Sequence, residues 1–157
     1  MRLVVVGERM NLPTWRPRYW PDVHGDRHWR LMLRLGAFRD ARSRAKLASL
    51  GLAEYDSINL LPPDPQGTSW DAEKAEEVAV TWMEKFRAYD QCLLAGARVA
   101  RAFHLGGGMG RLMGKSTCAC GVRVVVIPHP SGLNRFWNSR IKVDSLSERL
   151  TILLRVR

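Results

Sequence analysis

Residues 122–135 of the chain read VRVVVIPHPSGLNR. The β-branched residues in 122–127 predict a strand that is buried on both faces of a sheet. Pro128 and Pro130 end this strand, because proline has no backbone N–H to donate to a neighbouring strand. His129 is therefore held between two residues of fixed φ, just beyond the carboxyl end of a strand, where open α/β sheets bind their ligands. A histidine in this place either caps a turn carbonyl or serves a ligand site, and we favour the ligand site.

Short apolar segments alternate with segments of helical spacing along the 157 residues. We expect strands at residues 3–6, 55–61, 91–95 and 122–127, and helices at about 30–35, 40–50, 69–89, 98–104 and 141–154. This alternation predicts a single α/β domain over residues 1–157, with three α/β/α layers around a central four-stranded, mainly parallel sheet. The glycine-rich segment 106–110 is predicted to be a flexible bend, because it lacks the Gly-Lys-Ser/Thr ending of a phosphate-binding loop.

Three residues follow or end the predicted strands. Gly7 ends the first strand, Asn59 lies near the end of the second, and His129 follows the last. Because the carboxyl ends of parallel strands meet at one edge of a sheet, we expect these residues to lie near one another. A glycine, an amide and an imidazole offer close backbone approach, paired donor and acceptor atoms, and a titratable ring. The alternative for Asn59 is a structural amide that closes a turn.

Positive charge is the strongest feature of the composition. The chain has 25 Lys and Arg against 15 Asp and Glu, which gives a formal net charge of +10. This excess favours a polyanionic partner such as DNA, although a generally basic proteome would also produce it. In residues 14–30, arginines interleave with tryptophans and a tyrosine, a pattern that suits either nucleic acid or a covering loop packed on the core. The basic residues Arg39, Arg42, Arg44 and Lys46 form either a phosphate-binding face or an ordinary solvated one.

The three cysteines do not predict a disulfide framework. Cys92 lies in an apolar segment and is expected in the core, whereas Cys118 and Cys120 lack the second pair that a zinc site needs. His24 and His28 are separated by Gly25, which weakens a helix that would bring them together. We therefore expect no metal and no cofactor. The chain has no apolar run of membrane-spanning length and its first residues do not form a signal peptide, so we expect an intracellular, cytoplasmic protein.

Four segments of the chain, in order, resemble the motifs of the uracil-DNA glycosylase superfamily. They are VVVGE at 4–8, SINLLPP at 57–63, LLAGA at 93–97 and IPHPSGLNR at 127–135. The resemblance covers nearly the whole chain, and the last motif is the most specific. It implies a monofunctional DNA glycosylase that needs no metal or cofactor and acts on uracil or another damaged or modified base. Such enzymes flip a base out of the duplex and cleave its N-glycosidic bond in base excision repair, with the base leaving as an anion.

The resemblance also implies roles for individual residues around the base. His129 is similar to the histidine that donates to the uracil O2 as negative charge grows there. Asn59 is similar to the asparagine that reads the edge of the pyrimidine, and Gly7 is expected beside the base. Phe38, in the segment GAFR at 36–39, resembles the aromatic residue that stacks on the flipped base. Its alternative role is a core residue.

The segment after the histidine implies contacts to DNA. Leu133 resembles the wedge that fills the vacated stack, although it is also suited to covering an apolar surface. The other residues are expected to hold phosphates or the opposite strand, or to shape the loop that does so: Pro130, Ser131, Gly132, Asn134 and Arg135.

The first motif departs from the family pattern. Members of the family carry Asp or Asn to position water, usually followed by proline, whereas this chain has Arg9 and Met10. Either Glu8 or Asn11 is left to orient the water and balance positive charge on the sugar. The alternatives to a monomeric glycosylase are a non-catalytic relative that binds a flipped or modified base, and a small-molecule enzyme that acts on a nucleotide. The compact chain fits a bacterial or viral member of the family.

Overall fold

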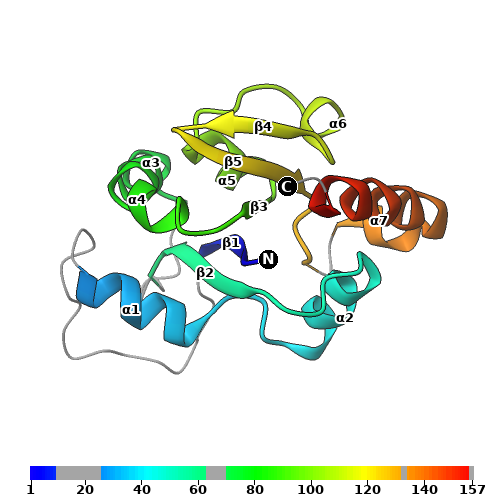
Figure 1. Cartoon of the computed structure of the whole chain (residues 1–157), viewed down its shortest axis with the longest axis horizontal. Coiled ribbons are helices and arrows are strands. Elements are labelled where there is room, and N and C mark those ends of the chain that lie inside the picture. The colour runs from blue at the N-terminus through cyan, green and yellow to red at the C-terminus, as the bar shows by residue number, and fades with distance from the viewer. Residues whose placement is uncertain (10–25, 63–69, 132–133, 156–157) are drawn as a thin grey trace.

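The computed structural model describes residues 1–9, 26–62, 70–131 and 134–155, and Figure 1 shows their arrangement. Five strands form one sheet, in the order β2-β1-β3-β5-β4. The strands are β1 (Leu3–Arg9), β2 (Asp56–Leu61), β3 (Gln91–Ala95), β4 (Ser116–Ala119) and β5 (Val122–Ile127). All neighbouring strands run parallel except β4, which pairs with β5 in the antiparallel direction. The α/β class and the mainly parallel sheet are confirmed.

Helices cover both faces of the sheet, as the alternation of segments predicts. The helices are α1 (Asp26–Leu35), α2 (Ala41–Ser49), α3 (Ala72–Thr81), α4 (Met83–Phe86), α5 (Ala97–Ala102), α6 (Met109–Leu112) and α7 (Arg140–Arg155), with a 3₁₀ turn η1 at Arg135–Asn138. Figure 1 shows α1, α3 and α4 on one side of the sheet and α2 and α7 on the other. Each layer closes over its own core. One core gathers Val78, Trp82, Phe86 and Phe103 against the sheet, and the other gathers Leu47, Leu50, Leu146 and Leu150.

The prediction of four strands is wrong, because β4 is a fifth. Its sequence, STCA, is mostly exposed and has no apolar run that would mark it as a strand. It forms because Cys120 and Gly121 both adopt positive φ, of 50° and 74°, and so make the tight turn that joins it to β5. Such a two-residue turn fits the twist of an antiparallel hairpin, and glycine takes this conformation without strain.

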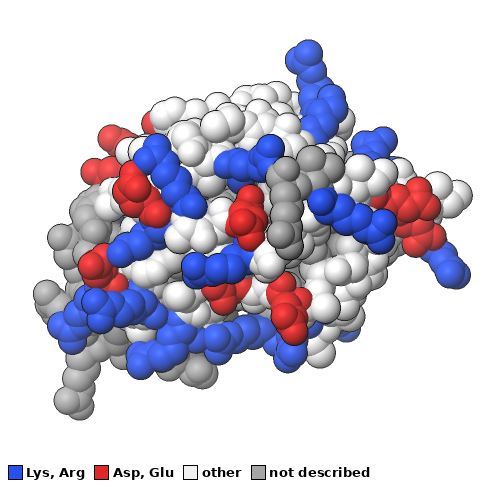
Figure 2. Space-filling view, viewed as in Figure 1, with Lys and Arg blue, Asp and Glu red and all other residues white. Residues whose placement is uncertain are grey.

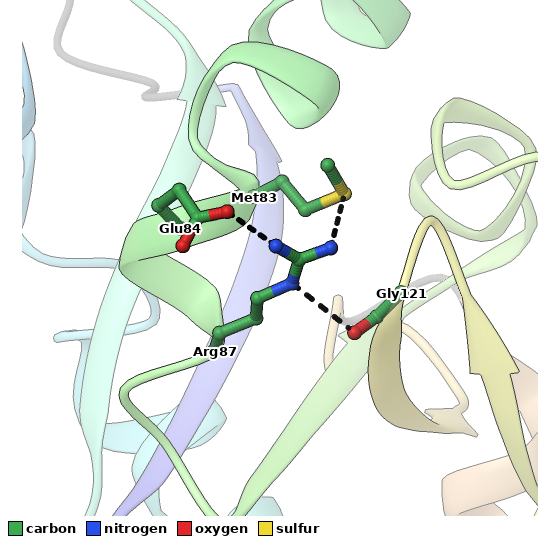
Figure 3. Close-up of polar contacts among 4 residues, drawn as sticks. All are labelled: Met83, Glu84, Arg87 and Gly121. Atoms are coloured by element: carbon green, nitrogen blue, oxygen red, sulfur yellow. Dashed lines mark hydrogen bonds and ion pairs between the residues drawn. The ribbon is translucent and has the colours of Figure 1, made fainter.

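The hairpin formed by β4 and β5 is attached to the helical layer by Arg87, which follows α4. Figure 3 shows the guanidinium group between the hairpin and the helix, where it donates to the side chains of Glu84 and Met83 and to the Gly121 carbonyl, the last at 3.4 Å. A side chain at Gly121 would begin 2.5 Å from the Arg87 Nη2. Glycine therefore serves both the turn and the close approach of the arginine.

Most helix boundaries follow local signals in the sequence. Asp40 and Asp71 accept backbone hydrogen bonds at the starts of α2 and α3, at 2.9 and 3.0 Å, and so cap these helices. The single helix expected at 69–89 is wrong, because it divides at Trp82 into α3 and α4. The bend expected at 106–110 is wrong in part, because α6 begins at Met109.

Tryptophan, histidine and cysteine residues singled out in the sequence lie in or next to the core. The aromatic and basic segment at 14–30 lies outside the described residues up to position 25. Its described part places Trp29 in the core, 8% exposed, and buries His28 stacked on Trp82. Cys92 is fully buried as predicted. None of the described helices combines the length and hydropathy that a membrane-spanning segment needs.

Candidate functional site

The candidate site lies where the order of the sheet changes direction. From β1 the chain passes to β2 on one side, and later to β3 on the other. The carboxyl ends of β1 and β3 therefore lie where the order of the strands diverges, the usual place for ligands in such sheets. Gly7 and Glu8 lie at this end of β1, Gly96 follows β3, and His129 follows β5.

His129 is half-buried and its ring is held from several sides. The Phe38 ring meets it edge to face, with ring centroids 5.4 Å apart. The Ser131 backbone N–H donates to the Nδ1 of His129 at 3.1 Å. A nitrogen that accepts a hydrogen bond carries no proton, so the neutral ring has its proton on Nε2. No partner for Nε2 is found among the described residues, which leaves this N–H available to a ligand.

The surroundings of His129 favour the neutral ring. Burial lowers the pKa of His129 below its ordinary value, and the positive charges of Arg98 and Lys46 act in the same direction. The Glu8 carboxylate opposes them. The backbone carbonyl of His129 accepts from the Trp137 indole at 2.8 Å and from the Asn134 amide at 3.3 Å, so two side chains of the following segment hold the backbone at His129.

Asn59 lies beside Gly7 on the neighbouring strand. The two residues are direct partners in the pairing of β1 with β2. A Cβ atom at Gly7 would lie 2.3 Å from the Asn59 Oδ1 and 2.9 Å from the Phe38 Cζ. Asn59 is only 5% exposed, and its side-chain oxygen lies toward Gly7 near the carboxyl end of β1. An amide offers both a donor and an acceptor at this edge of the sheet, which suits a ligand with paired polar groups.

Phe38 has a strained backbone that a neighbouring serine supports. Its φ is 53°, an unfavourable conformation for a residue with a side chain. Ser57 of β2 holds Ala37, the residue before Phe38. Its hydroxyl donates to the Ala37 carbonyl and accepts from the Ala37 N–H, each at 2.9 Å. Strain that the surrounding structure maintains is common at functional sites. Here it directs an aromatic ring toward Gly7 and His129.

Glu8 brings a carboxylate to the same edge of the sheet. At Gly96, whose φ is 98°, a Cβ atom would lie 3.2 Å from the His129 Cβ and 3.5 Å from the Glu8 Oε1. The carboxylate and the imidazole therefore share the space above this glycine. Arg98, in the first turn of α5, lies 3.4 Å from the other Glu8 oxygen and is mostly exposed. The site thus combines an anion, a neutral donor, an amide and an aromatic ring.

The structure places most of the predicted site residues. It brings together Gly7, Glu8, Phe38, Asn59 and His129. Asn11, Gly132 and Leu133 lie outside the described residues.

The remaining residues of the predicted DNA-contacting loop follow directly from His129. Pro130 is buried, Ser131 is half-buried and Arg135 is exposed. Asn134 uses its amide within the loop, because it donates to the His129 carbonyl and accepts from the Phe136 N–H at 3.0 Å.

Four further residues of the site were not predicted from the sequence: Ser57, Lys46, Arg98 and Trp137. The alternation of a strand would have found Ser57, because it lies two residues before Asn59 on the same face. Nothing local marks the other three, which reach the site through tertiary packing.

A separate open cleft of about 1170 Å³ lies between α2 and the amino-terminal end of β2. Arginine and aromatic side chains line it, among them Arg2, Arg39, Arg44, Phe38 and Tyr55. Phe38 is shared by this cleft and the candidate site, whereas His129 and Asn59 do not line the cleft. Over the described ranges, no three His, Cys, Asp or Glu side chains are grouped as metal ligands.

Basic side chains are unevenly spread over the surface. Figure 2 shows Lys and Arg gathered at the lower left, where Figure 1 places α1, and mixed with acidic side chains elsewhere on this face. The exposed arginines of α1 are Arg27, Arg30 and Arg34, which recur at the spacing of one helix face. They form a stripe that can meet several phosphates.

No model of a protein family matches this sequence, and no curated protein matches it.

Proposed function

We propose that the chain is a DNA glycosylase that hydrolyses the N-glycosidic bond of a flipped uracil or another damaged or modified base. One observation carries the proposal: the Asn59 amide and the His129 ring both lie close to the Phe38 ring, and the His129 Nε2–H has no partner among the described residues. An amide, a neutral N–H donor and an aromatic face are the groups that read and stack a nucleobase. The order of the motifs along the chain supports the same function.

His129 serves the leaving base in this proposal. As the N-glycosidic bond breaks, its electron pair passes to the base, and negative charge grows on a carbonyl oxygen of the ring. The Nε2–H of a neutral imidazole donates to that oxygen and stabilises the charge without a proton being transferred first. The hydrogen bond from Ser131 to Nδ1 holds the ring in the required tautomer.

Glu8 acts at the sugar in this proposal. Loss of the base leaves positive charge on the ring oxygen and C1′, which a nearby carboxylate stabilises. A water molecule oriented by the same carboxylate forms the new bond to C1′, and its proton passes to solvent or to the departing base. The pairing with Arg98 holds the Glu8 carboxylate beside His129.

The charge of the molecule supports a polyanionic substrate. The net charge of +10 and the stripe on α1 supply phosphate contacts, as does the exposed Arg135 that follows the His129 loop. We expect a monomer that works on DNA inside the cell, with binding that weakens steeply as salt is raised.

The direct test is an oligonucleotide with a single uracil, treated with the protein and then with alkali. We expect strand breaks at the uracil, and loss of cleavage with retained DNA binding in Glu8→Gln and His129→Ala. Asn11→Ala separates the two candidates for orienting water. Glu54→Gln and His104→Ala are the controls, because both residues are exposed and lie outside the site. Cleavage of a free nucleoside but not of DNA would indicate a nucleotide enzyme instead.

A second candidate is a relative that binds a flipped or modified base without cleaving it. The Glu8–Arg98 pair favours it, because a carboxylate already engaged with a guanidinium is less free to orient water. Intact strands across uracil, hypoxanthine and xanthine substrates, together with tighter binding to one of them than to normal DNA, would select the binder.

A further inference from the structure

Lys46 of α2 faces inward, although the sequence places it among exposed basic residues. Its ammonium group donates to the Pro130 carbonyl at 3.2 Å and to the Ser131 carbonyl at 3.0 Å. It also lies 5.9 Å from the centre of the Trp137 ring. The lysine therefore connects α2 to a loop more than eighty positions later in the chain.

The Pro130 carbonyl and the Ser131 N–H belong to the same peptide group. Lys46 binds the carbonyl end of this group, and the N–H end donates to the Nδ1 of His129. A cation on a peptide oxygen draws electron density away from the N–H and strengthens it as a donor, because hydrogen bonds in a chain polarise one another. The ammonium group thus acts on the imidazole through one rigid, planar unit.

We propose that Lys46 is a positioning residue, which holds the Pro130–Ser131 peptide so that His129 presents its Nε2–H to the ligand. This inference rests on the proposed function for the identity of that ligand. The charged groups that face His129 are Glu8 from β1, Arg98 from α5 and Lys46 from α2. Of these three, Lys46 is the one hydrogen-bonded to the loop that carries the ring.

The test compares Lys46→Met, which removes the charge but retains an unbranched apolar stem, with Lys46→Arg, which keeps a cationic donor. Lys74→Met on α3 is the control, because it removes the same charge from an exposed position in the opposite helical layer. The readout is magnetic resonance of isotope-labelled histidine nitrogens, followed across pH.

For wild type and Lys74→Met we expect one neutral tautomer, with the proton on Nε2. For Lys46→Met we expect a mixture of the two neutral tautomers of His129. We also expect the midpoint of the His129 titration to move to higher pH, because a positive charge near the ring is lost. Lys46→Arg should restore the wild-type spectrum in large part. Retention of the wild-type tautomer and midpoint in a folded Lys46→Met protein would overturn the proposal, and its folding is checked by thermal unfolding.

Activity gives a second, separate readout. With uracil DNA as substrate, we expect kcat of Lys46→Met to fall roughly 10-fold or more with little change in KM, the scale of one hydrogen bond to a charged group. If wild type cleaves nothing but the spectra change as expected, the glycosylase proposal fails and the positioning role stands. If wild type cleaves and the spectra do not change, the positioning role fails alone.

Discussion

The Asn59 side-chain oxygen occupies the space that a side chain at Gly7 would need. The two residues face each other across β1 and β2, with the oxygen 2.3 Å from the position of a Cβ atom. Gly7→Ala should therefore displace Asn59 and the Phe38 ring, because strand backbone yields less readily than side chains. We expect a loss of stability of about 1–3 kcal/mol and a larger loss of base recognition. Thermal unfolding and binding to uracil DNA measure the two effects.

The matched control is Gly110→Ala in α6, where a Cβ atom meets nothing within 4 Å. We expect this variant to unfold at or above the wild-type temperature, since alanine is the better helix former. A Gly7→Ala protein that binds and unfolds like wild type would show that Asn59 is not confined by this contact.

The protonation of His129 predicts a pH dependence of folding. Its pKa is lowered in the folded protein, mainly by burial, so below about pH 6.5 the unfolded chain binds more protons than the folded one. The contribution of the neutral His129 ring to the free energy of unfolding is fully present above that pH. It is lost as the pH falls toward the pKa that His129 has in the folded protein. We expect His129→Gln to have a shallower dependence of the free energy of unfolding on pH between about 7 and 5. Denaturant unfolding at several pH values measures the slopes.

His104→Gln is the control for this slope, because His104 is exposed and pairs with Glu76 at 2.8 Å on the surface. Equal slopes for wild type and His129→Gln would contradict burial as the cause of the shift.

Ser57 offers a test of the support beneath Phe38. Ser57→Ala leaves both the N–H and the carbonyl of Ala37 without the hydroxyl, at a cost of about 1–3 kcal/mol. For a domain of this size, that corresponds to a fall in Tm of roughly 2–12 °C. We also expect weaker stacking on the base. Ser49→Ala is the control, because its hydroxyl bonds only within α2; equal losses in the two variants would exclude a special role for Ser57.

The sequence predicts the parts of the fold that depend on local chemistry. Apolar runs mark β1, β3 and β5, and helical spacing marks the segments that contain α2 and α3. β4 escapes detection because an exposed edge strand carries no core pattern and depends on its pairing with β5. The break between α3 and α4 at Trp82 is not predicted from the sequence, because the apolar spacing of a helix continues on both sides of it.

The candidate site also divides into residues that local sequence predicts and residues that depend on tertiary packing. Residues next to strand ends, such as Asn59 and His129, are found from sequence because the topology of a parallel sheet brings them to one edge. Lys46 and Trp137 are not, since their contacts with the His129 loop depend on how α2 and η1 pack. Ser57 is an intermediate case. Strand alternation places it on the same face as Asn59, so it can be predicted once Asn59 is taken as a site residue.

The hairpin turn at Gly121 gives the last prediction. Gly121→Ala places a side chain at φ 74° and moves the Arg87 guanidinium, whose Nη2 lies 2.5 Å from the new atom. We expect a loss of about 1–2 kcal/mol from the backbone conformation, with a further loss from the weakened contacts to the Gly121 carbonyl. Denaturant unfolding measures the total for the single variant.

A double-mutant cycle separates these two terms. In an Arg87→Ala background the guanidinium is absent, so Gly121→Ala should cost only the backbone term. The coupling between the two substitutions then measures how strongly Arg87 attaches the hairpin to the helical layer (Figure 3). Additive losses would mean that the arginine contributes nothing to stability through Gly121.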